Sequence, residues 1–136
     1  MIFLLIILYI GLLSVSLVVI QKLERILNNF LDKNIIINDQ TALNEYKSSV
    51  RQCMYISLVI ILIIVIATCI SIALMFYKGF FASVSFIIFR LLLNGFGKEA
   101  MELEKKARAL DCANSDLEEQ YQRISHTWVK KALPDF

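Results

Sequence analysis

The 136-residue chain has little of what soluble domains depend on. It contains one proline and four glycines, which excludes a collagen-like chain or a loop-rich extracellular module. Its three cysteines are an odd number and cannot form a closed disulfide framework. Charged residues make up only 19% of the chain, whereas a typical soluble domain carries about 25%. The composition therefore excludes an ordinary soluble domain.

Residue types and motifs that support catalysis or nucleic-acid binding are also scarce. The formal charge of +2 argues against a strongly basic nucleic-acid-binding domain. The sequence has no Cys-x-x-Cys pair, no phosphate-binding loop and no nucleophile motif. On one helix the single histidine, His126, would lie about 21 Å from Cys112, too far to share a metal ion. We expect no enzyme activity, no cofactor, no small-molecule substrate and no nucleic-acid partner.

Hydrophobic residues are in excess. They make up 58% of the sequence, and the mean hydropathy is +0.67. Most of them lie in three runs, residues 2–20, 54–77 and 79–97, of which only the third contains a charge, that of Arg90. A helix of about 20 apolar residues crosses the hydrocarbon core of a bilayer. The sequence thus predicts an all-α integral membrane protein with three transmembrane helices.

The first run has the features of an uncleaved membrane anchor. No basic residue precedes its apolar core, and Gln21-Lys22-Leu23-Glu24 follows it. A cleaved signal peptide has a basic start, a shorter core and a cleavage site with small residues. We therefore assign residues 1–21 to transmembrane helix 1. Residues 54–77 are assigned to transmembrane helix 2.

The third run follows the second almost without interruption. Lys78 and Gly79 are all that separates them, so we expect helices 2 and 3 to form a tight hairpin. Arg90 costs residues 79–97 about 2.5–3.5 kcal/mol of insertion free energy if it lies at the centre of a spanning helix. Its side chain can extend toward the Lys98 end, or it can contact an anion, a lipid headgroup or a partner subunit. A re-entrant or interfacial helix is the alternative to a third span.

Basic residues next to the runs predict the orientation. Residues 22–53 contain five lysines and arginines and the segment after the third run begins with four more, whereas Lys78 alone lies on the other side. Lysine and arginine are enriched on the cytoplasmic side of membrane proteins. We expect the N-terminus outside a bacterial cytoplasmic membrane, with residues 22–53 and 98–136 inside. An unpaired exposed thiol at Cys112 suits that reducing compartment.

Residues 22–53 are expected to form a cytoplasmic helical loop. Helical spacing of apolar residues continues past the first run to Leu31 and is then interrupted between Asn34 and Asp39. Asp39 or Thr41 is placed to cap a second helix that leads into the second run. One face of that helix would carry Leu43, Tyr46, Val50 and Cys53. The two helices would pack on each other beneath the membrane.

Residues 98–133 contain neither glycine nor proline, and their pattern predicts one continuous helix. Apolar residues recur alternately three and four positions apart, which is typical of a coiled coil. We expect this coiled-coil-like tail, residues 98–136, to bind other membrane-complex subunits or a second copy of the chain. The predicted partner-binding residues are Leu103, Leu110, Asn114, Leu117, Tyr121, Ile124 and Trp128.

Asn114 is the polar residue within that predicted face. A buried asparagine in a coiled coil lowers stability but fixes the register and the number of strands. Alternatively, Asn114 faces water or marks a helix break together with Ser115. Tyr121 and Trp128 are large for a two-stranded seam, so a different partner helix or the membrane surface suits them at least as well as self-pairing.

A membrane anchor with a docking helix and no catalytic motif favours a structural function. We expect an accessory, anchoring or assembly subunit of a larger membrane complex, with membrane lipid as a further partner. Two alternatives are a self-assembling holin-like pore and an immunity or exclusion protein that binds one membrane target. The pore would share three spans and a charged cytoplasmic tail, but a long ordered coiled coil would be unusual in it.

Overall fold

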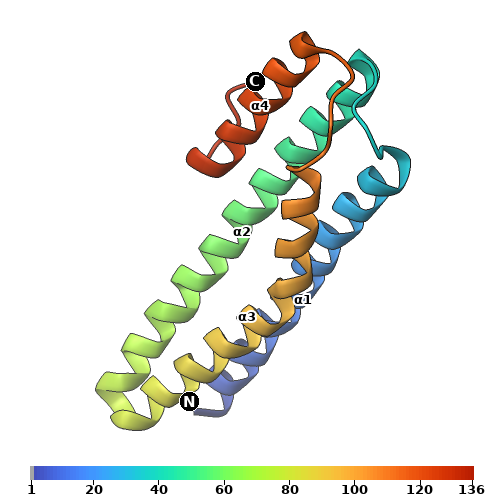
Figure 1. Cartoon of the computed structure of the whole chain (residues 1–136). Helices are drawn as coiled ribbons and strands as arrows, with labels where there is room; N and C mark the ends of the chain where they lie inside the picture. Colours follow the sequence, from blue (N-terminus) through green and yellow to red (C-terminus); the bar gives the residue numbers. More distant parts are fainter. Residues whose placement is uncertain (1) are drawn as a thin grey trace.

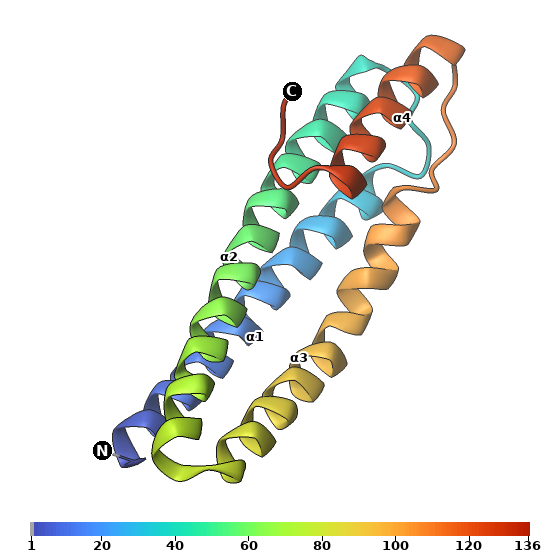
Figure 2. The ribbon, with the colours of Figure 1, turned by 90° about the vertical axis from the view of Figure 1, so that its left-hand side faces the viewer.

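The computed structural model of the chain describes residues 2–136, with all side chains except those of Ile2, Leu5, Phe81 and Ala82. These residues form the helices α1 (Ile2–Lys33), α2 (Gln40–Lys78), α3 (Phe80–Ala107) and α4 (Ser115–Lys130). The first three are long and run side by side, whereas α4 packs against α2 at one end of the bundle (Figures 1 and 2). The predicted all-α class is confirmed.

Local sequence signals define both ends of α2. The carboxylate of Asp39 accepts a hydrogen bond from the backbone N–H of Ala42 at 2.8 Å, which caps the first turn. The helix ends at Lys78 because Gly79 adopts a φ of 70°, which side-chain-bearing residues rarely adopt. The chain then reverses directly into α3. Both the predicted Asp39 cap and the predicted tight hairpin are confirmed.

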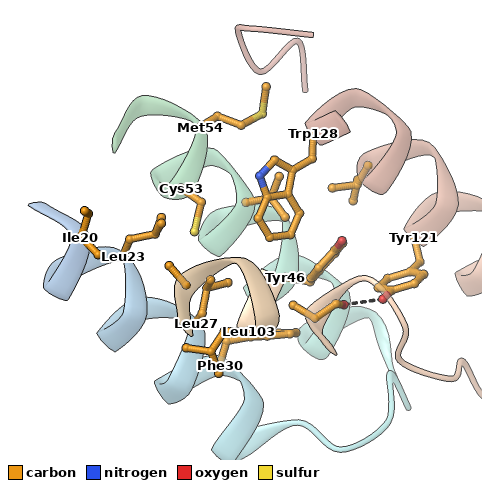
Figure 3. Packing of buried hydrophobic residues seen from close by; sticks show 14 of the residues in the cluster. Ile20, Leu23, Leu27, Phe30, Tyr46, Cys53, Met54, Leu103, Tyr121 and Trp128 are labelled. Carbon is orange, nitrogen blue, oxygen red and sulfur yellow. Dashed lines mark hydrogen bonds between the residues drawn. The ribbon is translucent and has the colours of Figure 1, made fainter. Parts of the chain in front are cut away.

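Burial is concentrated at the end of the bundle that is far from Gly79. We call residues 20–54 and 98–136 the cap, because their apolar side chains pack into one core (Figure 3). All four helices contribute to it, and the predicted face of α2 is buried as expected. Its buried apolar residues include Leu23, Leu27, Phe30, Ile37, Leu43, Tyr46, Val50, Cys53, Met54, Ala100, Leu103, Ala107, Leu117, Tyr121, Ile124 and Trp128.

The other end of the bundle has the opposite character. We call residues 2–19 and 55–97 the apolar layer, because most of their large hydrophobic side chains are exposed. Exposed apolar surface on this scale marks a surface that meets something other than water. The helices α1 and α2 are long and apolar enough to cross a membrane. The 39 residues of α2 extend for about 58 Å at 1.5 Å per residue, so a bilayer core of about 30 Å covers only part of that helix.

The prediction of one continuous helix over residues 98–133 is wrong. α3 ends at Ala107, and α4 begins only at Ser115. The segment between them pairs with the loop between α1 and α2: the N–H of Ile37 donates to the carbonyl of Asp111 at 2.9 Å, and the N–H of Ala113 donates to that of Ile37 at 3.0 Å. This pairing turns the chain, so α4 lies against α2 instead of extending away from the bundle.

The break in the helix is stabilised by burial. A continuous helix would carry the apolar residues of the last four turns away from the rest of the chain. The break lets α4 place Leu117, Tyr121, Ile124 and Trp128 in the cap core. Burying each of these four side chains contributes about 1.5–3 kcal/mol. The bonds of Ile37 to residues 111 and 113, and those of the Tyr121 hydroxyl to Ala107 and Leu110, replace part of the helical hydrogen bonding interrupted at the break.

Two isoleucines in the loop between α1 and α2 differ in burial and allow a matched pair of substitutions. Ile37 is fully buried, whereas Ile35, two residues earlier, is 81% exposed. Ile37→Ala should lower the free energy of unfolding of the cap by about 2–5 kcal/mol, because it leaves a cavity beside the strand-like pairing with residues 111–113. Ile35→Ala should change it by less than about 0.5 kcal/mol. The fluorescence of Trp128, the only tryptophan, reports unfolding of the detergent-solubilised protein. Equal effects of the two substitutions would contradict this packing.

Candidate functional site

The structure places most of the predicted partner-binding residues inside the chain's own core. Leu103 on α3 and Leu117, Tyr121, Ile124 and Trp128 on α4 are buried in the cap. Leu110 is half-buried and Asn114 is exposed, and both lie between α3 and α4. Their role in binding a partner stays a prediction, and it would require the buried side chains to leave the cap core.

Aromatic rings make up the centre of the contact between α2 and α4. The ring of Tyr46 on α2 lies 4.7 Å from that of Tyr121 and 6.3 Å from that of Trp128, measured between centroids. On its other side, the ring of Phe30 on α1 lies 5.5 Å away. Figure 3 shows these side chains converging from α1, α2 and α4. Offset and tilted aromatic pairs stabilise a core by about 0.5–1.5 kcal/mol beyond their buried area.

Hydrogen bonds satisfy the hydroxyl groups within this cluster. The hydroxyls of Tyr46 and Ser125 are hydrogen-bonded at 2.7 Å. The hydroxyl of Tyr121 donates to the carbonyl of Ala107 at 2.5 Å and accepts from the N–H of Leu110 at 3.1 Å. Tyr121 therefore satisfies backbone groups freed where α3 ends, and this ties α4 to that end.

Asn114 faces water and marks the helix break, which is the second of the two roles predicted for it. Its carbonyl accepts the N–H of Glu118 at 3.0 Å, and its extended backbone makes it the N-cap residue of α4. The side chain is exposed and forms no capping hydrogen bond. The prediction of a buried asparagine that fixes a coiled-coil register is wrong, because the helix is interrupted at this point.

Burial suppresses ionisation in the cap. The Cys53 side chain is fully buried, and burial raises the pKa of its thiol to about 12, with the charge of Glu104 adding to the shift. Burial also raises the pKa of Tyr46. It raises the pKa of Glu104 as well, although the guanidinium of Arg108 at 3.4 Å opposes that shift. The Cys53 thiol is thus protonated at neutral pH and is not an activated nucleophile.

A polar cavity of about 570 Å³ lies between α1 and α3, where the cap meets the apolar layer. Gln21 and Glu24 of α1 face Lys98, Glu99 and Glu102 of α3 across it. Burial raises the pKa of Glu24, and the charge of Glu99 adds to this. Among the side chains that the structure describes, no group of three His, Cys, Asp or Glu residues is placed to hold a metal ion.

One tyrosine connects the three long helices within the apolar layer. The Tyr9 hydroxyl on α1 is hydrogen-bonded to that of Ser71 and donates to the carbonyl of Ala67 at 3.3 Å, both on α2. Its ring meets Phe89 of α3 edge-on at 5.6 Å. Ala67 and Ser71 are small residues four positions apart, a spacing that permits close approach of helices in membranes. No sequence signal identified Tyr9 as the residue that fills this contact between α1 and α2.

Arg90 lies on the outer face of α3. Its neighbour Phe89 is buried against α1, while the side chain of Arg90 is exposed. Asn94 and Lys98 are also exposed and follow at intervals of four residues, so all three lie along one side of the helix. Arg90 is about 16 Å along α3 from Gly79 at 1.5 Å per residue. Its charge therefore lies within the apolar layer, on the exposed surface of α3.

The two hydrogen bonds of Tyr121 generate a second prediction. Tyr121→Phe keeps the ring in the aromatic cluster but leaves the Ala107 carbonyl and the Leu110 N–H without this partner. We expect the cap to lose about 1–3 kcal/mol of unfolding free energy, the cost of buried unsatisfied groups. Tyr77→Phe, which removes the hydroxyl of a 72% exposed tyrosine, is the control. Denaturant titration followed by Trp128 fluorescence measures the unfolding free energy of both variants. An unchanged unfolding free energy in Tyr121→Phe would contradict the role of Tyr121 in tying α4 to the end of α3.

Comparisons with protein family models, with curated protein sequences and with solved structures give no match to this chain.

Proposed function

We propose that the protein is a non-catalytic integral membrane protein that spans a bacterial cytoplasmic membrane three times. Its N-terminus lies outside and its cap lies in the cytoplasm. It acts as an accessory, anchoring or assembly subunit of a larger membrane complex. The apolar layer forms the contact with lipid and with a partner subunit, and the cap holds the helices together on the cytoplasmic side.

The alignment of the three apolar runs supports a third span. The N-terminal end of α1 and the turn at Gly79 lie at the same end of the bundle (Figures 1 and 2). Residues 79–97 cover about 28 Å at 1.5 Å per residue, close to the thickness of a bilayer core. In this arrangement α3 crosses the same layer as α1 and α2, and packs beside both of them.

The distribution of basic residues supports the orientation. Lys22 and Arg25 on α1, Arg51 on α2 and Lys98 on α3 all belong to the cap. Of the other basic residues, Arg90 lies within the apolar layer, and Lys78 lies at the far end of the bundle, beside the hairpin turn. Because lysine and arginine are retained on the cytoplasmic side, this arrangement favours a cytoplasmic cap.

The exposed position of Arg90 is the observation that carries the proposed function. An arginine within a bilayer is costly unless it reaches water, a headgroup or an acidic partner. The three apolar runs contain no aspartate, glutamate or histidine. A second copy of this chain therefore offers no carboxylate in this layer. A partner helix with an acidic residue near this depth would neutralise Arg90 and give the complex its specificity.

The same position of Arg90 bears on the holin-like alternative. A pore built from copies of this chain needs polar surface facing its channel, and Arg90 with Asn94 could supply it. A channel lined in this way would bring the Arg90 side chains of neighbouring copies together. Their like charges repel, which costs free energy in a medium of low dielectric constant. A complex with a different subunit avoids this repulsion, so we favour it over the pore. An immunity or exclusion protein would use the same contact with a single target.

Reporter fusions test the orientation. A reporter that is active only in the cytoplasm should be active when fused after Phe136. A reporter that requires export should be active when inserted between Lys78 and Gly79. If the fusions at both positions require export, the third run does not span, and the re-entrant alternative is correct.

Photo-crosslinking in intact cells tests the partner. A photoreactive residue in place of Leu91, which is exposed next to Arg90, should form one discrete adduct with a different membrane protein. Arg90→Leu should reduce that adduct at least about tenfold, because it leaves the partner's acidic group unpaired, whereas Arg90→Lys should retain part of it. A photoreactive residue in place of Ile72, exposed on α2, is the positional control. A ladder of adducts between copies of this chain would instead support the pore.

A further inference from the structure

The C-terminal end of α4 lies where the cap meets the apolar layer. α4 runs in the same direction as α2, so its last turn points toward that layer (Figures 1 and 2). A cavity of about 180 Å³ separates this end from the bundle. Trp128 and Lys131 from the end of α4 line it opposite Leu58 and Ile61 of α2, with Glu104 of α3.

Helix lengths place this end at the level of the lipid headgroups. Lys98, the first basic residue after the third run, lies about 28 Å along α3 from Gly79. The same distance along α2 from Lys78 reaches about Val59. The second run extends five residues further, to Met54. Residues 54–58 therefore emerge from the hydrocarbon layer, and the end of α4 lies beside them.

The surface presented at this level is both apolar and basic. Val129 is 53% exposed and Leu133 is 59% exposed, although large apolar residues are mostly buried elsewhere in the cap. Lys130 and Lys131 between them are exposed as well. Exposed apolar residues flanked by lysines are typical of segments that lie in the interface of a membrane.

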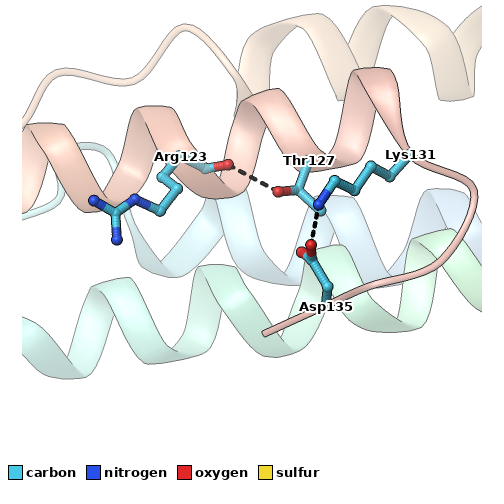
Figure 4. A network of polar contacts seen from close by, with 4 residues as sticks. All are labelled: Arg123, Thr127, Lys131 and Asp135. Carbon is cyan, nitrogen blue, oxygen red and sulfur yellow. Dashed lines mark hydrogen bonds and ion pairs between the residues drawn. The ribbon is translucent and has the colours of Figure 1, made fainter.

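Contacts on both sides of this surface fix its shape. Within α4 the Thr127 hydroxyl donates to the carbonyl of Arg123 at 3.1 Å, and after the helix Lys131 forms an ion pair with Asp135 (Figure 4). The chain then turns back along α2, where the ring of Phe136 lies 5.5 Å from the ammonium of Lys47. The segment therefore reverses at residues 131–134, which presents Leu133 at the turn.

We propose that residues 129–133 form an anchor that inserts into the headgroup layer of an anionic membrane. Val129 and Leu133 enter the interface, and Lys130 contacts lipid phosphates, while Asp135 offsets much of the charge of Lys131. Trp128 lies at the depth where aromatic residues are enriched in membrane proteins. The anchor rests on the membrane-spanning arrangement proposed above. It holds α4 against the membrane at one end, while the pairing of Ile37 with residues 111–113 holds the other end.

Fluorescence of the single tryptophan tests the anchor in the full-length chain. The protein is reconstituted into phosphatidylcholine vesicles with or without phosphatidylglycerol, and Trp128 is quenched by lipids brominated near the headgroup or deep in the acyl chains. With phosphatidylglycerol present, the shallow quencher should act at least about twofold more strongly than the deep one. The variant Val129→Ser/Lys130→Gln/Leu133→Ser should lower shallow quenching at least about twofold and raise quenching by aqueous iodide. Replacing phosphatidylglycerol with phosphatidylcholine should have the larger effect on the unaltered chain.

The chain offers a matched control at the far end of the cap. Ile35→Ser/Ile36→Ser also removes two exposed apolar side chains, but from the loop between α1 and α2, and should leave the quenching unchanged. Protection of the buried Cys53 from maleimide, in a Cys69→Ser/Cys112→Ser background, verifies that each variant keeps its cap folded.

The possible failures of the two proposals are distinguishable. If alkaline carbonate extracts the protein from the vesicles, the spanning arrangement itself is wrong. If the protein stays inserted but shallow quenching of Trp128 is the same in the triple variant, the anchor is overturned. The anchor is also overturned if the shallow and the deep lipid quenchers act equally on Trp128 in the unaltered chain, because the end of α4 would then not lie at the level of the headgroups.

Discussion

The continuity of α2 is the constraint on which the rest of the structure depends. Its first half supplies Tyr46, Val50 and Cys53 to the cap core, and its second half belongs to the apolar layer without a break between them. α1, α3 and α4 all pack against it. A single rigid helix of this length couples the packing in the cap to the position of the helices in the layer, so neither half can tilt independently of the other.

Local sequence patterns predicted most of the helical architecture. The Asp39 cap and the Gly79 turn follow from the chemistry of single residues, and the buried face of α2 follows from helical spacing. The break between α3 and α4 was not predictable in the same way. Apolar residues spaced three and four apart fit a long helix as well as two helices that fold together. The pairing of Ile37 with residues 111–113 joins segments more than 70 positions apart, which no local pattern encodes.

The candidate site was predictable only in part, for a related reason. Helical spacing correctly indicated that Leu117, Tyr121 and Ile124 avoid water, but spacing does not specify whether a partner or the same chain covers them. Arg90 was identifiable because a charge within an apolar run is costly wherever it lies. Tyr9 was not identifiable from the sequence, because its hydroxyl forms a hydrogen bond with Ser71, which lies on another helix.

Cysteine scanning along α2 in intact membranes tests the central claim most directly. Each position of α2 is replaced in turn in a chain without its native cysteines, and its reaction with a membrane-impermeant maleimide is measured from the cytoplasmic side. A membrane-spanning α2 predicts reactivity that rises and falls with the helical period from Gln40 to about Leu58, followed by uniform protection from about Val59 through residue 77. Helical periodicity that continues through residues 59–77 would show that water reaches one face of the whole helix, and would contradict a membrane-spanning α2.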